Sequence, residues 1–151
     1  MGKLEYIPGD LVMTNGVPLG TAKDVVYRVV SSDPSKTLKL NDGTVLKGVV
    51  RLENLEDAEF GDKGYLLGEC CAWVKDIVPI PLSPKILEKN GWKVSLEGTW
   101  IYEKEDSVKI FRLLDDKHYA AYIGFIRLEF QYIHQLQHLL FGLGIDNNLE
   151  V

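Results

Sequence analysis

Three prolines between positions 79 and 84 constrain the fold of this chain more than any other feature. Proline lacks the N–H that a strand ladder needs, so Pro79-Ile80-Pro81-Leu82 cannot continue as a central strand. We therefore expect the chain to leave a first sheet here and place a boundary near Pro81. This predicts two modules, residues 1–80 and 81–151, in a chain of 151 residues that is long enough to build a real core.

The first module is predicted to be a run of short strands separated by turns. Pro8-Gly9-Asp10 opens the first strand, Asn15-Gly16 ends it, and Asn41-Asp42-Gly43 suits the tight turn of a hairpin over 36–50. The predicted strands span 10–14, 25–31, 37–40, 45–52 and 72–78. Their number and spacing predict a small SH3-like β-barrel, an architecture that by itself implies no activity.

The second module is predicted to run helix, antiparallel meander, helix. Ser83 followed by Pro84 is typical of a helix start, and Asn90-Gly91 ends that helix at Lys89. Hydrophobic residues then alternate from Trp92 onward, with turns expected at 97–98, 104–106 and 115–117 and the last strands within 118–130. The predicted fold class of the whole chain is therefore α+β.

The closing helix, predicted over 131–144, carries two different faces. At about 100° per residue, one stripe is apolar and should face a core; it contains Ile133, Leu136, Leu140 and Leu143. His134, His138 and Phe141 fall together on a second stripe, which lies well over 100° around the helix axis from the centre of the first. Gly142 and Gly144 are expected to end the helix. The second stripe is the face that we predict to meet a partner.

Composition indicates an ordinary globular protein of a reducing compartment. Seventeen basic residues against 22 acidic ones give a net charge of -5, which disfavours nucleic acid as a partner. No apolar run is long enough to span a membrane, and the N-terminus lacks the apolar core of a secretory signal. Cys70 and Cys71 are adjacent, so a disulfide between them would be strained. We therefore expect a cytoplasmic protein without membrane contact.

His134 and His138 have the spacing of the two histidines on a zinc-protease helix. A protease needs glutamate directly after the first histidine as its general base, and this chain has Gln135, which cannot accept a proton. Two histidines alone also leave a metal under-coordinated. We therefore predict no metal site on this helix.

Other candidate chemistry also has a simpler structural explanation. The two cysteines are expected to be buried as small hydrophobic residues, and Asp115-Asp116 to hydrogen-bond their own turn. The acidic segment 53–62 lacks the spacing of a calcium loop and is expected to be solvated. We predict no catalytic residue and no cofactor, although a site assembled from separate strands would be invisible in the sequence.

Binding features are better supported than catalytic ones. The meander is rich in aromatic residues, namely Trp92, Trp100, Tyr102, Phe111, Tyr119 and Tyr122. Strand alternation favours core positions for them, while a sheet this small leaves room for a platform that includes Trp92, Trp100 and Tyr102. Gln135 either caps backbone groups or binds a polar ligand through its amide. The histidine face of the closing helix would also suit a second copy of the chain.

The C-terminal half resembles a family of small uncharacterised proteins of Bacteroides-type bacteria and their phages. The residues that carry the resemblance lie within 80–143 and are Ile80-Pro81-Leu82, Leu87, Asn90-Gly91-Trp92, and Tyr132-Ile133-His134-Gln135-Leu136-Gln137 with Leu139 and Phe141. The resemblance implies a phage or mobile-element origin. It implies no activity and no catalytic residue.

Together these observations predict a non-enzymatic binding or interaction protein. The resemblance suggests that it captures a host factor or a small nucleotide-like signal, as an anti-defence protein would. Two alternatives from other classes stay open, a nucleotide-directed hydrolase and a structural component of a virion. The predicted binding residues are His134, His138, Phe141, Trp92, Trp100, Tyr102 and Gln135.

Overall fold

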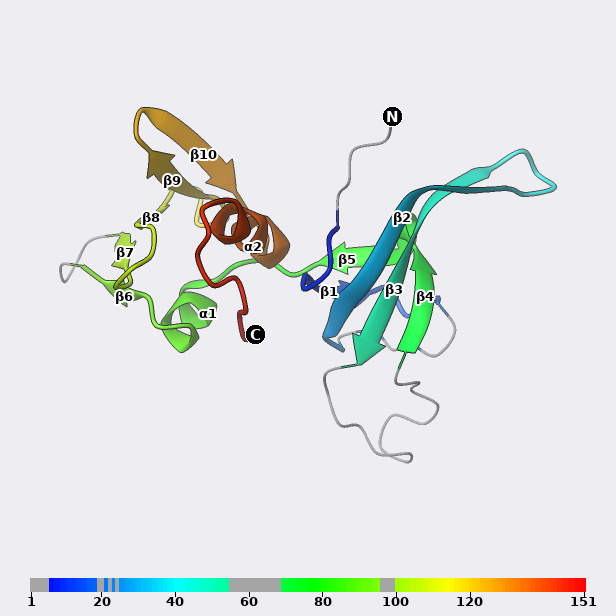
Figure 1. The fold of residues 1–151 in the computed structure, drawn as a ribbon, viewed down its shortest axis with the longest axis horizontal. Helices are drawn as coiled ribbons and strands as arrows, with labels where there is room; N and C mark the ends of the chain where they lie inside the picture. The colour runs from blue at the N-terminus through cyan, green and yellow to red at the C-terminus, as the bar shows by residue number, and fades with distance from the viewer. Residues whose placement is uncertain (1–5, 19–20, 22, 24, 55–68, 96–99) are drawn as a thin grey trace. The chain divides into compact units, whose positions relative to one another are not determined.

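The computed structural model describes residues 6–18, 21, 23, 25–54, 69–95 and 100–151. The chain divides into two compact units, Met1–Pro79 and Ile80–Val151, which are drawn together in Figure 1. The first unit ends at one of the prolines that break the sequence pattern. Most of the acidic segment, predicted to be solvated, lies outside the described residues.

The N-terminal unit is a five-stranded antiparallel sheet in the order β4-β3-β2-β1-β5. A short 3-10 helix, η1, joins β4 and β5, and the five strands are labelled in Figure 1. The elements are β1 (Leu11–Thr14), β2 (Tyr27–Lys39), β3 (Val45–Asn54), β4 (Glu69–Trp73), η1 (Val74–Asp76) and β5 (Ile77–Pro79). The predicted hairpin is confirmed, because β2 and β3 pair on either side of the turn at 41–43.

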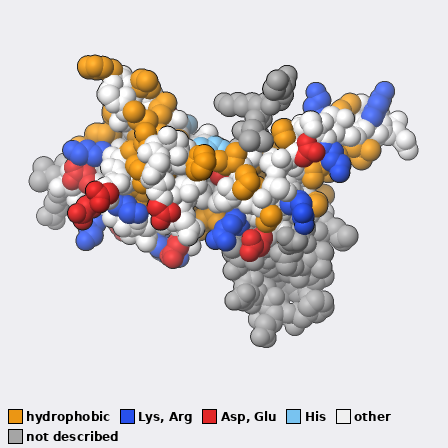
Figure 2. Space-filling view, in the orientation of Figure 1, with side chains coloured by type: hydrophobic (Ala, Val, Ile, Leu, Met, Phe, Trp, Pro, Cys, Tyr) orange, Lys and Arg blue, Asp and Glu red, His pale blue; other side chains and the backbone are white. Residues whose placement is uncertain are grey.

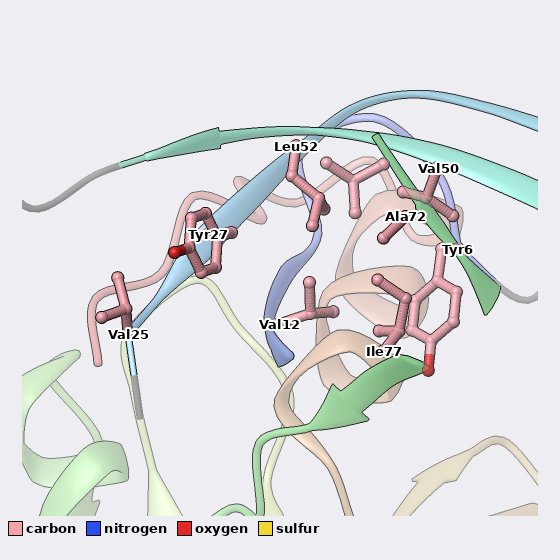
Figure 3. Close-up of a cluster of buried hydrophobic side chains, with 9 residues drawn as sticks. Tyr6, Val12, Val25, Tyr27, Val50, Leu52, Ala72 and Ile77 are labelled. Carbon is pink, nitrogen blue, oxygen red and sulfur yellow. The ribbon is translucent and has the colours of Figure 1, made fainter. Parts of the chain in front are cut away.

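The core of this unit lies on one face of the sheet, where side chains from every strand converge (Figure 3). Alternation explains the choice: in β2, Tyr27 and Val29 are buried while Arg28 and Val30 are half-buried. The buried cluster contains Tyr6, Val12, Val25, Tyr27, Val29, Val50, Leu52, Ala72 and Ile77. Beyond it the β2–β3 ribbon continues with largely exposed side chains.

Three sequence predictions for this unit need correction. The predicted strands 25–31 and 37–40 form one strand, because shifts of register after Val29 and after Asp33 absorb the intervening residues. The predicted strand 72–78 is interrupted by η1, where the Asn15 amide donates to the buried Asp76 carboxylate at 2.9 Å. The sheet is also open rather than closed into a barrel, because β4 and β5 are the two ends of its hydrogen-bonded order.

The C-terminal unit combines an antiparallel meander with two helices, which confirms the α+β class. Its sheet has the order β10-β9-β8-β7-β6, so consecutive strands are neighbours. The elements are α1 (Pro84–Lys89), β6 (Lys93–Val94), β7 (Ile101–Glu103), β8 (Ile110–Arg112), β9 (Tyr119–Ile123), β10 (Ile126–Phe130) and α2 (Ile133–Gly142). Ser83 caps α1 as predicted, its Oγ accepting from the Ile86 N–H at 3.3 Å. The predicted turn at 97–98 lies outside the described residues.

The start of α2 is fixed to the segment that enters this unit. The Ile133 N–H donates to the Ile80 carbonyl, and the Leu82 N–H donates to the Gln131 carbonyl, each at 2.9 Å. Pro81 lies opposite Tyr132 in this short antiparallel bridge. The apolar stripe of α2 is then buried through Ile133, Leu136 and Leu140. Leu143, predicted to share that stripe, follows the helix and is exposed.

The end of α2 reverses the chain, and the tail packs back on the unit. The Gly144 N–H donates to the Phe141 carbonyl and the Ile145 N–H to the Leu140 carbonyl, with Gly144 at a φ of 71°. This is a Schellman ending, in which glycine tolerates the left-handed conformation. The Asn90 side chain then donates to the Glu150 carbonyl and accepts from the Glu150 N–H, both at 2.7 Å. The tail, with Leu149 buried, is therefore part of the fold.

Alanine substitutions on the buried and exposed faces of α2 should have clearly different effects on the free energy of unfolding. Leu136→Ala or Leu140→Ala should lower the free energy of unfolding by about 2 to 5 kcal/mol, because each leaves a cavity in the core. Phe141→Ala is the matched control on the same helix: its side chain is 65 % exposed, so the change should stay within about 0.5 kcal/mol. Urea unfolding followed by circular dichroism measures all three, and equal losses would contradict this packing of α2.

Candidate functional site

An open pocket of ≈ 500 Å³ lies between the β9–β10 hairpin and α2. Hydrophobic side chains gather along this hairpin in Figure 2. The pocket is lined from the sheet by Ile123, Leu128, Glu129 and Phe130, and from α2 and the residue after it by Gln135, His138, Leu139, Gly142 and Leu143. Its lining is mostly apolar with a few polar groups, the composition that binding pockets commonly have.

The two walls follow from the periods of a strand and a helix. Along β10, alternation gives Leu128 and Phe130 the same face. Along α2, steps of three and four residues align Gln135, His138 and Gly142 with Leu139 beside them. Because Gly142 has no side chain and its Cβ position meets no atom within 4 Å, the helix wall is open at its C-terminal end.

The structure separates the three residues of the predicted partner face. His138 lines the pocket, whereas Phe141 is exposed and is not among the residues that line it. His134 is buried; its ring stacks on Tyr132 with centroids 6.0 Å apart and meets His138 edge-on at 5.6 Å. His134 therefore does not share an exposed face with Phe141, because its ring is covered by Tyr132.

Gln135 serves the helix start and also borders the pocket. Its Oε1 accepts from the Gln131 N–H at 2.8 Å and from the Tyr132 N–H at 3.0 Å. These bonds satisfy backbone donors just before the first turn of α2. The capping alternative for this glutamine is thus confirmed. The same side chain, held by these two bonds, also lines the pocket.

The predicted aromatic platform does not form, because two of its three residues are in the core. Trp92 is buried, with its Nε1 donating to the Val108 carbonyl at 3.1 Å and the Lys104 Nζ 4.6 Å from its ring centroid. Tyr102 is also buried, and only Trp100 is exposed. Tyr102 is the central residue of β7 and is buried between two half-buried neighbours, whereas Trp92 and Trp100 lie just before β6 and β7.

The meander also contains an acid and histidine pair that the sequence interpretation missed. His118 Nδ1 lies 2.5 Å from the Asp115 carboxylate, which also accepts from the His118 and Lys117 N–H groups. These backbone bonds, followed by the histidine side chain, lower the pKa of Asp115 from 3.8 to about 2. Both side chains are partly exposed and the contacts belong to one turn. The predicted turn role of Asp115 is confirmed, and the sequence signal was an acid three residues before a histidine.

The prediction that both cysteines are buried needs correction. Cys71 is exposed rather than buried, because β4 is an edge strand and alternation gives the core position to Ala72. The Cys70 side chain lies outside the described residues. Within the described part of the chain, no three His, Cys, Asp or Glu side chains gather into a group that could hold a metal ion.

Comparisons with protein-family models, with curated proteins and with solved structures found no match to this chain. The resemblance of residues 80–143 therefore stays a prediction. Among the described helices, none combines the length and apolar character that crossing a membrane would require.

The Asp115 turn predicts a specific dependence of stability on pH. Its pKa is about 2 in the folded protein and 3.8 as the ordinary value, so folding favours the ionised form. Asp115 then stabilises the fold above about pH 4, and this contribution disappears as pH falls toward about 2. Carboxyl-carbon NMR should give the low midpoint, and Asp115→Asn should reduce the acid loss of stability. Asp116→Asn, with the same charge change in the same turn, is the control; equal effects would contradict the assignment.

The two histidines of α2 should respond differently to truncation. His134→Ala removes a buried ring packed on Tyr132, so it should lower the free energy of unfolding by roughly 1 to 3 kcal/mol. His138→Ala trims the wall of an open pocket and should change it by less than about 0.5 kcal/mol. Thermal and urea unfolding of the two variants make the comparison. Equal costs would mean that His138 also belongs to the core.

Proposed function

We propose that this chain is a non-enzymatic binding protein whose C-terminal unit holds an apolar side chain of a protein partner. The pocket between β10 and α2 is the single observation that carries the proposal. It is large enough for an aromatic side chain, it is open to solvent, and its walls belong to regular elements. Exposed Ile126 and Phe125 on the adjoining hairpin extend the apolar surface beyond the pocket.

The chemistry of the lining favours an apolar side chain over a nucleotide. Phosphate is usually held by Lys, Arg or a cluster of backbone N–H groups. The described lining contains neither Lys nor Arg, and its acidic residue, Glu129, would repel a phosphate. The nearest cation along β10, Arg127, already pairs with Glu129 at 2.8 Å. A neutral aromatic or aliphatic group fits these walls, with His138 and Gln135 available for hydrogen bonds at its edge.

A host factor is the partner that the resemblance to phage-associated proteins favours. Capture of such a factor needs a stable surface and no turnover.

For the N-terminal unit we propose an opened SH3-like arrangement. Its support is that β1 lies between β2 and β5, so the first and last strands are neighbours. This architecture assigns no activity to that unit.

The pocket can be tested with indole, which reproduces the side chain of tryptophan without charge. Indole added to isotope-labelled protein should shift the NMR signals of the Leu128, Leu139 and Leu143 methyl groups, while adenosine monophosphate should not. Gly142→Trp should abolish the shifts, because a side chain there enters open space and fills the pocket. Gly142→Ala is the matched control. It changes the same position but leaves most of the pocket volume open, so this variant should still bind indole.

Three results would contradict the proposal. If the nucleotide shifts the pocket signals and indole does not, the pocket serves the nucleotide-like signal instead. If neither probe shifts them, or if Gly142→Trp binds indole as well as Gly142→Ala does, this pocket is not the binding site. The melting temperature of each variant shows whether a loss of binding comes from a loss of folding.

A further inference from the structure

Strand β10 is an edge of the C-terminal sheet. Within the described residues β9 is its one neighbour in the hydrogen-bonded order, and four of its five residues are exposed, Ile126 by 61 %. An edge strand presents backbone N–H and C=O groups that another strand can pair with. A strand that pairs with this edge needs side chains that match Ile126-Arg127-Leu128-Glu129-Phe130.

The turn before β10 determines which backbone groups point outward. Gly124 and Phe125 form a two-residue turn with Ile123 opposite Ile126, and Gly124 has a φ of 61°. In such a turn the flanking pair is a hydrogen-bonded one. Hydrogen-bonded and non-hydrogen-bonded pairs then alternate along an antiparallel ladder. The N–H and C=O groups of Arg127 and Glu129 therefore point away from β9, toward the free edge.

The side chains of β10 are complementary to those of a second β10 in the opposite direction. The strand is symmetric about Leu128, with a cation on one side, an anion on the other and apolar residues outside both. Antiparallel pairing centred on Leu128 places Arg127 of each copy opposite Glu129 of the other. A parallel pairing in register would instead place like charges opposite each other, which is unfavourable.

We infer that two copies of this chain associate through β10, antiparallel and centred on Leu128, to join their sheets into one. The outward backbone groups of Arg127 and Glu129 fall at the hydrogen-bonded positions of this pairing, and the two Leu128 side chains meet across its centre. Charges on an edge strand often prevent association. Here they are opposite in sign and placed symmetrically, so they favour it. The inference does not depend on what the pocket binds.

Charge reversal provides the test, with sedimentation velocity from low micromolar to near-millimolar concentration. The unmodified chain should form dimers as its concentration rises. Arg127→Glu and Glu129→Arg should each weaken the dimer by about tenfold or more, because each puts like charges into two symmetry-related pairs. The double variant R127E/E129R should restore it, and mixing the two single variants should give a heterodimer. Lys93→Glu, on exposed β6 at the opposite edge, makes the same charge change as R127E and should leave the dimer intact.

Amide exchange gives a second measurement that does not rely on variants. In the dimer the Arg127 and Glu129 N–H groups become hydrogen-bonded, so their exchange should slow as concentration rises, whereas that of Leu128 should not change. A chain that stays monomeric at every concentration overturns the inference. So does a dimer that both single reversals leave unchanged, or a mixture of the single variants that forms no heterodimer.

Discussion

The C-terminal unit depends on the short antiparallel bridge between residues 80–82 and the residues before α2. Two backbone hydrogen bonds, from Ile133 to Ile80 and from Leu82 to Gln131, fix the point at which α2 begins. Gln135 satisfies two further N–H groups at that point. With its start fixed, α2 can bury Leu136 and Leu140 and present its next face to β10. The pocket is therefore a consequence of where one helix is anchored.

Pro79 and Pro81, where the first unit ends and the second begins, also make this anchor compact. Proline cannot donate to a ladder, so the entering segment cannot extend into a wide sheet. Pro81 nevertheless occupies a bridge position opposite Tyr132, while its neighbours Ile80 and Leu82 supply the carbonyl and the N–H. Both of these neighbours are buried. A short bridge with buried flanks can hold a helix start without competing with the meander for strand partners.

Sequence patterns predicted the α+β class, the main hairpin and the meander because alternation, turns and caps are local, whereas the prediction of a closed barrel was wrong. The Ser83 cap, the hairpin around Asn41-Asp42-Gly43 and the order of the meander all came from neighbouring residues. The site was less predictable, because it depends on what covers a helix. His134 looked exposed on a helical projection, yet it packs on Tyr132. Gln137 is buried where the returning tail offers the Asn147 carbonyl to its side chain. No local pattern shows that a tail will return.

The pocket wall was missed for a related reason. Leu128 and Gly142 are unremarkable in the sequence, and they form a site only because β10 and α2 lie side by side. Conversely, Trp92 and Tyr102 are conspicuous in composition but serve the core. Large aromatic residues bury the most area, so in a small sheet they are needed inside first. Most of the residues that line the pocket lie outside the core, and Phe130 belongs to both.

Strand β10 can serve both proposals because its side chains and its backbone point in perpendicular directions. Leu128 and Phe130 project from one face of the sheet toward α2, whereas the free N–H and C=O groups lie in the plane of the sheet. A two-fold axis perpendicular to the sheet keeps both α2 helices on the same face of the joined sheet. Two pockets would then face the same way, and a partner with two apolar side chains would gain from binding both at once. Dimerisation through the edge would thus strengthen the binding of such a partner without occupying either pocket.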